Sequence, residues 1–332
     1  MPDLVTLEEI EDAARRLSGI VLRTPLVPLR GAAPSAPLLL KAESLQPVGS
    51  FKLRGAYAAI SALPEEERKN GVIAHSSGNH AQAVAYAAGV LGIPAILVVP
   101  NTIPAVKADA CRALGAEMLF VEPTIEARVE TTDRLAAAHG YALIPPFDDA
   151  RIIAGQGTIG LEILADEPEA DAVFVPIGGG GLIAGVATAI KAKRPETKVI
   201  GVEPELAADA RDSFRVDRRM GWPAADTART IADSLRVERV GELPFEHLRT
   251  YVDDVIMVSE DEIRATMRLL AHRAGLIAEP GGAVATAGAV AYGSRGRPHG
   301  GRPQRHVAVV SGRNVDPGLY AEILGQPDQP TR

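Results

Sequence analysis

The chain has 332 residues, of which 46% are hydrophobic and 23% are charged, and its formal net charge is −7. A chain of this length exceeds what one hydrophobic core usually supports, so we expect two domains. The acidic balance argues against a nucleic-acid partner, whose phosphates would have to be neutralised by the protein surface. Cys111 is the only cysteine, which excludes an intrachain disulfide and a cysteine-based metal cluster.

The sequence shows no signal peptide and no clear membrane segment. Its first residues lack the basic and apolar parts of a signal peptide. The longest uncharged run, residues 172–190, nearly reaches membrane-spanning length, but Pro176 and five glycines in it favour a strand, a loop and a helix. We therefore expect a cytoplasmic protein without a membrane partner.

The first predicted elements lead to a lysine. Thr6 and Glu9 form a capping box, which predicts a helix over residues 10–17. A short strand is expected over residues 38–43, and Ser50-Phe51-Lys52-Leu53-Arg54-Gly55-Ala56 follows it. A lysine among apolar neighbours loses hydration, so its amine deprotonates more readily and can form an imine with an aldehyde. This chemistry makes Lys52 a candidate to bind pyridoxal phosphate.

Strands and helices then alternate to about residue 150. Strands are predicted over 72–74, 95–100 and 118–121, with a helix over 81–92 after the first. Such alternation predicts a parallel sheet covered on both faces.

The first of these helices is preceded by Ser76-Ser77-Gly78-Asn79-His80. Its short polar side chains and free N–H groups suit a carboxylate, although the same residues could form an ordinary N-cap. His75 and His80 lack partners at metal-ligand spacing and are expected to be structural.

The second half repeats the alternation around a glycine loop. The predicted elements are a strand over 172–176, a helix over 182–193, strands over 198–203 and 306–311, and a helix over 263–274 capped by Ser259 and Glu262. Segments 292–305 and 325–332 are expected to be an exposed loop and a loose tail.

The loop Gly178-Gly179-Gly180-Gly181 lies between a predicted strand and a predicted helix. Glycine lets several backbone N–H groups turn toward one point, and a helix start adds partial positive charge, so the loop suits a phosphate. A tight turn under close packing is the structural alternative, but four glycines cost much backbone entropy.

The same loop supports a rival interpretation. Gly179, Gly181 and Ala184 satisfy a dinucleotide-binding pattern, and Glu203 ends the next strand, where a ribose-binding acid belongs. An NAD-dependent dehydrogenase is therefore an alternative, but it gives no reason for the lysine stretch or for residues 76–80. Residues 203–209 also offer two or three carboxylates, which form either a solvated acidic loop or a site for a hard cation.

Taken in order, these stretches resemble the fold-type II pyridoxal-phosphate enzymes, in particular the threonine/serine dehydratase and serine racemase group. The resemblance covers about residues 6–316. It rests on the stretches 50–56, 76–80, 154–158 (Ala-Gly-Gln-Gly-Thr), 178–182, 230–233 (Thr-Ile-Ala-Asp) and 311–316.

The resemblance implies an α/β fold similar to the tryptophan synthase β subunit, with two open, mostly parallel twisted sheets and the cofactor between a large and a small domain. We expect residues 1–52 and 148–325 to form the large domain, 53–147 the small domain and 326–332 a loose tail.

The resemblance also implies the site residues. Lys52 would bind pyridoxal phosphate covalently and move the α-proton, and Ser77 matches the acid/base of the racemase-like members on the opposite face. The implied cofactor-binding residues are Phe51, Lys52, Asn79, Gly178, Gly179, Gly180, Gly181, Leu182 and Ser311. The implied substrate-binding residues are Ser76, Ser77, Gly78, Asn79 and His80. Glu203, the carbonyl of Ala207, and Asp209 match a site for Mg²⁺ or another divalent cation.

One departure from the family is visible. Arg313 stands where the family has the second glycine of Ser-Gly-Gly-Asn. If that glycine needs a positive φ angle, arginine there costs about 1 kcal/mol.

The function implied is an ammonia-lyase, a homodimer, that eliminates water and ammonia from L-threonine or L-serine. A serine racemase and a 3-hydroxyaspartate-type ammonia-lyase share the machinery and remain alternatives, as does a catalytically silent amino-acid-binding protein. The chain ends soon after its last predicted strand, so we expect no regulatory domain and no isoleucine feedback. Arg128 could meet a substrate side chain or occupy a surface helix position.

Overall fold

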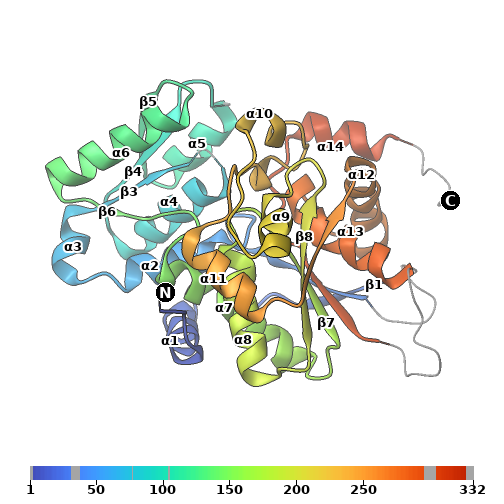
Figure 1. The fold of residues 1–332 in the computed structure, drawn as a ribbon. Helices are drawn as coiled ribbons and strands as arrows, with labels where there is room; N and C mark the ends of the chain where they lie inside the picture. Colours follow the sequence, from blue (N-terminus) through green and yellow to red (C-terminus); the bar gives the residue numbers. More distant parts are fainter. Residues whose placement is uncertain (1–2, 31–37, 77, 104, 295–303, 327–332) are drawn as a thin grey trace.

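A computed structural model describes residues 3–30, 38–76, 78–103, 105–294 and 304–326 (Figure 1). The strands form a six-stranded sheet in the order β1-β2-β10-β7-β8-β9 and a four-stranded sheet in the order β5-β4-β3-β6. Every neighbouring pair is parallel except β1 and β2. The predicted α/β class with two mostly parallel sheets is therefore confirmed.

The strands of the larger sheet are β1 (Leu26–Leu29), β2 (Leu38–Lys41), β7 (Ala172–Pro176), β8 (Lys198–Pro204), β9 (Asp254–Val258) and β10 (His306–Val309). Both faces of this sheet are buried. In β7, Phe174 joins one hydrophobic cluster while Val173 and Val175 join the cluster on the opposite face. Side chains alternate along a strand, so this split shows helices covering both faces, as a parallel sheet requires. The helices around this sheet are α7 (Ala150–Asp166), α8 (Gly181–Lys193), α9 (Asp209–Val216), α10 (Ala224–Thr227), α11 (Glu242–Tyr251), α12 (Glu260–Leu269), α13 (Pro280–Ser294) and α14 (Pro317–Leu324).

The smaller sheet contains β3 (Val72–His75), β4 (Ala95–Pro100), β5 (Glu117–Val121) and β6 (Ala142–Leu143). Its helices are α3 (Glu65–Asn70), α4 (Asn79–Leu91), α5 (Ala105–Ala113) and α6 (Ile125–His139). Figure 1 shows this group at the left of the view and the larger sheet at the right.

Helix α2 (Lys52–Ser61) lies where the two groups meet, close to both α4 and α7 (Figure 1). Small residues allow this approach: a Cβ on Gly55 would lie 2.3 Å from the Gln156 side chain, and one on Gly155 would lie 2.6 Å from the Arg54 carbonyl. Helix α2 is thereby held tightly against α7, and its first residue is Lys52.

Several local predictions are confirmed. The capping boxes of Thr6 with Glu9 and of Ser259 with Glu262 are both present, and they start α1 (Leu7–Leu17) and α12. Residues 172–190 form a strand, a loop and a helix. No helix in the described ranges combines the length and the apolar character needed to cross a membrane.

Other boundaries differ from the predictions. The strand from residue 38 ends at Lys41, and a short 3-10 turn, Glu43–Leu45, follows it. Residues 292–294, predicted as loop, belong to α13, and the helix predicted to residue 274 ends in a π turn from Leu270. Residues 295–303 and 327–332 lie outside the described residues, and the domain boundaries stay a prediction.

Candidate active site

Lys52 begins α2, and its amine is largely withdrawn from water. Nζ donates a hydrogen bond to the Pro146 carbonyl over 2.7 Å and lies 5.3 Å from the centre of the Phe51 ring. Burial lowers the pKa of the lysine to about 8, although the negative charge of Glu279 opposes the shift. A larger fraction of the amine is therefore neutral at pH 7 than in a solvated lysine, as bond formation with an aldehyde requires.

Asn79 is the first residue of α4 and connects the two sheet groups. Its Nδ2 donates to Glu279 Oε1 over 2.7 Å, and its Oδ1 accepts from Asn314 Nδ2 over 2.7 Å. Asn314 also donates to the Val48 carbonyl. This chain of side chains places Asn79 beside the segment that leads to Lys52.

Ser311 follows β10 and is nearly buried, with 4% of its surface exposed. Its carbonyl accepts from the Phe51 N–H over 3.0 Å, so it lies next to the lysine stretch. Its hydroxyl donates only a long, 3.5 Å hydrogen bond to the Gly281 carbonyl. The hydroxyl is therefore free to turn toward a heteroaromatic nitrogen.

The glycine loop leads from β7 into α8. Among the described residues, the backbone N–H groups of 178–182 find no acceptor, as expected where a helix begins. A Cβ on Gly179 would lie 2.1 Å from the Phe147 ring, and one on Gly181 would lie 2.8 Å from the Phe147 carbonyl. Phe147 therefore leaves no room for a side chain at Gly179 or Gly181, while the unpaired N–H groups of the loop suit a phosphate.

The same loop is connected to the lysine in space through residues 146 and 147. Phe147, which packs on Gly179 and Gly181, directly follows Pro146, whose carbonyl accepts from Lys52. These groups suit the parts of pyridoxal phosphate. The amine with a lowered pKa suits its aldehyde, the unpaired loop amides suit its phosphate, and the weakly bonded serine hydroxyl suits its ring nitrogen.

The polar turn before α4 is described only in part, because the predicted acid/base Ser77 lies outside the described residues. The Gly78 N–H donates to Ser76 Oγ over 3.3 Å. His80 is 3% exposed, and its Nε2 lies 2.8 Å from the Ile144 carbonyl. Burial, together with the charge of Lys52, lowers the pKa of His80 to about 3, so this ring is neutral. His80 therefore has a hydrogen bond to the main chain, and its contact with the substrate stays a prediction.

Glu203 and Asp209 are both fully buried behind the glycine loop. Glu203 accepts from the N–H groups of Ala210 and Arg211, and Asp209 Oδ2 accepts from the Val240 N–H over 2.7 Å. Val240 in turn lies 2.9 Å from where a Cβ on Gly180 would be.

The two carboxyls affect each other. Burial and the charge of Asp209 raise the pKa of Glu203, and burial also raises that of Asp209. Asp209 Oδ1 has no hydrogen-bond partner. No group of three or more His, Cys, Asp or Glu side chains in the described ranges is arranged to hold a metal, so a cation here would also need the Ala207 carbonyl.

The loop after Ser311 does not have the positive φ angle that would have made Arg313 unfavourable. Asp217 is the only non-glycine described residue with a positive φ, so Arg313 carries no such strain. Its side chain donates to the Ser44 carbonyl, and its N–H donates to the Gly49 carbonyl over 2.8 Å. The arginine therefore fastens this loop to the segment before Lys52.

Glu279 and the Pro146–Phe147 pair were not predicted from the sequence. Glu279 is 3% exposed and immediately precedes α13. An acid followed by Pro280-Gly281-Gly282 at a helix start is a local signal, but nothing in it indicates the distant Asn79 and Lys52.

Comparison with known proteins agrees with this geometry. The family model described as "Pyridoxal-phosphate dependent enzyme" matches residues 17–312. The chain is 40% identical to an L-threonine ammonia-lyase of Thermotoga maritima, over 97% of this chain and 79% of that protein. It is also 40% identical to an L-threo-3-hydroxyaspartate ammonia-lyase of Saccharomyces cerevisiae, over 98% of each. The solved structure of maize serine racemase superposes with a TM-score of 0.90 at 36% identity, covering 96% of this chain and 97% of that one.

Proposed function

The chain belongs to the pyridoxal-phosphate dependent enzyme family, and on that premise we propose that it is an ammonia-lyase acting on L-threonine, L-serine or both. The products would be 2-oxobutanoate or pyruvate, with ammonia. The observation that supports the proposal is Lys52, a lysine with a lowered pKa that contacts Pro146, next to the residue that packs on the glycine loop. The family assignment replaces the dehydrogenase alternative, and Glu203 is fully buried and bonded to two amides, which leaves it unable to bind a ribose.

Different residues of the chain would bind the cofactor and move the α-proton of the substrate. Bound pyridoxal phosphate supplies an electron sink for negative charge at the substrate α-carbon. Lys52 would hold it covalently through Nζ and take the α-proton on one face, and Ser77 would serve the opposite face. The amides of residues 178–182 would bind the phosphate, Asn79 the ring hydroxyl, and Ser311 the pyridine nitrogen.

The substrate carboxylate would lie at the start of α4. The Ser76 hydroxyl and the first N–H groups of the helix offer donors there, and the partial positive charge of a helix start favours an anion. His80 remains neutral and keeps its contact with Ile144, so it shapes this pocket without adding charge.

A 3-hydroxyaspartate substrate is a second candidate, favoured by Arg128. This half-buried side chain on α6 donates to the Thr124 carbonyl. Burial lowers the pKa of His75, and the charge of Arg128 lowers it further. His75 directly precedes Ser76, so the positive charge of Arg128 reaches the substrate end of β3. A second carboxylate on the substrate would be attracted to it.

One set of assays tests both candidates. L-threonine, L-serine and L-threo-3-hydroxyaspartate are incubated with holoenzyme, and 2-oxo acid, ammonia and D-serine are measured. Lys52→Ala is expected to abolish turnover and the near-visible absorption that borohydride removes from wild type. Turnover retained in Lys52→Ala would refute the assignment. Arg128→Gln is expected to raise KM for hydroxyaspartate alone if that compound is the substrate, and D-serine as the main product would indicate a racemase.

Three further properties belong to this proposal. A divalent cation would bind Glu203, the Ala207 carbonyl and Asp209, supported by the unpartnered Asp209 Oδ1. The protein would be a cytoplasmic homodimer. The large domain would contain residues 1–52 and 148–325 and the small domain residues 53–147, which accords with the strands of each sheet.

A further inference from the structure

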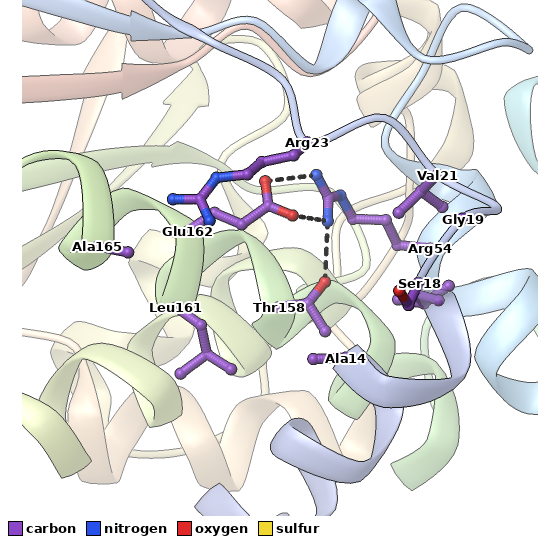
Figure 2. Close-up of a pocket in the computed structure, with 11 residues that line it drawn as sticks. Ala14, Ser18, Gly19, Val21, Arg23, Arg54, Thr158, Leu161, Glu162 and Ala165 are labelled. Carbon is purple, nitrogen blue, oxygen red and sulfur yellow. Dashed lines mark hydrogen bonds and ion pairs between the residues drawn. The ribbon is translucent and has the colours of Figure 1, made fainter.

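Arg54 lies two residues after Lys52 on α2 and is fully buried. Its Nε and Nη2 donate to the two oxygens of Glu43, both over 2.8 Å. Its Nη1 and Nη2 donate to the two oxygens of Glu162 over 2.7 and 2.9 Å. Figure 2 shows the Glu162 pair and the further bond from Nη1 to Thr158 Oγ1, which measures 3.1 Å. One guanidinium thus holds two carboxylates in paired, planar contacts.

Lys41 is a second cation in this cluster of Arg54, Glu43 and Glu162. The fully buried Nζ of Lys41 donates to Glu162 and to the Thr24 carbonyl, so two cations balance two carboxylates. Glu43 follows β2, Lys41 ends it, and Glu162 lies on α7. Apart from the Leu22 carbonyl, which accepts from Nη2 over 3.2 Å, the partners of Arg54 therefore belong to elements on the side of the larger sheet.

This arrangement constrains the direction of α2. A planar guanidinium that binds carboxylates through paired bonds permits little rotation, whereas a lysine ammonium would permit more. Side chains two positions apart on a helix point about 200° apart. Arg54 and Lys52 therefore lie on opposite faces of the first turn of α2. The contacts of Arg54 restrain the rotation of that turn and, with it, the direction of the Lys52 side chain.

We propose that Arg54 is a positioning residue, which acts with Glu43 and Glu162 to aim Lys52 at the glycine loop. This inference rests on the proposed function, because it assigns Lys52 as the residue that binds the cofactor. A residue that only stabilised the fold would change the unfolding temperature and leave the cofactor environment unaltered.

A cavity beside Arg54 makes the inference testable by chemical rescue. This cavity of about 400 Å³ is bordered by Arg54, Thr158 and Glu162, and its rim includes the exposed Ser18 and Arg23 (Figure 2). Removing the arginine side chain would leave a space next to two carboxylates that a small cation can enter from solvent. Guanidinium and ethylguanidinium match the missing group in charge and shape.

The experiment compares wild type, Arg54→Ala and Arg54→Lys as full-length holoenzymes. The readouts are the dissociation constant of pyridoxal phosphate, the pH titration of its absorbance without substrate, and kcat/KM. Arg54→Ala is expected to lose roughly tenfold to a hundredfold in kcat/KM through misplacement of Lys52, with weaker cofactor binding and a shifted titration. Millimolar ethylguanidinium should partly restore cofactor affinity, the titration and kcat/KM of Arg54→Ala. Arg54→Lys should give values between those of wild type and Arg54→Ala.

Two further variants separate positioning from folding. Lys191→Met breaks the Lys191–Asp253 pair near the far end of α8, and it should change the unfolding temperature without altering the titration. Arg54→Met combined with Glu43→Met removes one charge of each sign, a replacement that often preserves stability. If this double variant kept wild-type cofactor affinity and titration, the positioning role would be overturned.

The outcome for wild type separates this inference from the proposed function. A wild type that binds no cofactor at Lys52 would overturn both. A wild type with the cofactor on Lys52, together with Arg54→Ala that matches it in titration and affinity, would overturn the positioning role alone.

Discussion

Asn79 and Glu279, 200 positions apart, share a 2.7 Å hydrogen bond between Nδ2 and Oε1. The bond joins the start of α4, beside the smaller sheet, to the start of α13, which covers the larger sheet. Glu279 also faces Lys52 closely enough for its charge to oppose the burial that lowers the lysine pKa. The two sheet groups and the reactive amine therefore meet at one carboxylate.

Replacing Glu279 with glutamine should lower the pKa of Lys52 further. The amide still accepts from Asn79, but the negative charge that favours the ammonium form is gone. We expect the rate at which apoprotein takes up pyridoxal phosphate to reach half its maximum at a lower pH than in wild type. The control is Glu322→Gln, which removes an exposed carboxylate paired with Arg264. An unchanged or higher midpoint would contradict the electrostatic link.

Gly179→Ala should disturb the phosphate loop. The added methyl group would lie 2.1 Å from the Phe147 ring, so the ring or the loop must move, at a cost of about 1–3 kcal/mol in the free energy of unfolding. The affinity of Gly179→Ala for pyridoxal phosphate should also fall, because the loop that would bind the phosphate is displaced. Gly293→Ala is the matched control, because no atom lies within 4 Å of its new Cβ and α13 favours alanine by up to about 1 kcal/mol. Thermal unfolding and cofactor titration check both, and equal behaviour of the two variants would show that loop packing is unimportant.

The predictions from sequence succeeded where their signals are local. A capping box needs residues only three positions apart, so Thr6 with Glu9 and Ser259 with Glu262 could be identified directly. The glycine loop was likewise placed correctly between a strand and a helix from its own residues, and its phosphate-binding role stays a prediction. The antiparallel β1 at the edge of the larger sheet had no such signal, because its pairing with β2 depends on tertiary contact.

The parts that were not predicted depend on long-range pairing. Arg54 was visible within the lysine stretch, yet its role depends on Glu162, 108 positions away. Glu279 has no spacing relationship to Asn79 that a single sequence could reveal. Arg313 would have strained the loop only with a positive φ, which a single sequence could not reveal; it does not have one, and it donates to the Ser44 carbonyl.

His247 should make the docking of the N-terminal segment sensitive to acid. The Val5 N–H donates to its Nε2 over 3.0 Å, and Nδ1–H donates to the Leu243 carbonyl over 2.8 Å, so both nitrogens are used only in the neutral ring. Burial lowers the pKa of His247, although the Leu243 carbonyl, Glu246 and Glu9 oppose the shift.

A depressed histidine pKa in the folded state means that stability is full above about pH 6.5 and is lost as the pH falls below it. We expect His247 to contribute up to about 1.4 kcal/mol of loss per pH unit in that range. Urea titrations at pH 7.5 and 5.5 check this against His247→Gln, in which the other buried histidines still titrate. A pH dependence as steep in the variant as in wild type would exclude His247 as the cause.

The acidic pair behind the glycine loop should bind Mg²⁺ only when it is ionised. The pKa values of Glu203 and Asp209 are both raised, so the folded protein without a cation binds more protons than the unfolded chain. Its stability should therefore fall as the pH rises from about 4, the ordinary range of carboxyls, through the raised pKa values. Mg²⁺ competes with those protons, so the increase in unfolding temperature that it causes should be small at pH 5 and large at pH 8. Asp209→Asn keeps an acceptor for the Val240 N–H but removes the charge, and it should be insensitive to Mg²⁺ at both pH values. An equal Mg²⁺ effect at pH 5 and 8 in wild type, or one that survives in Asp209→Asn, would place the cation elsewhere.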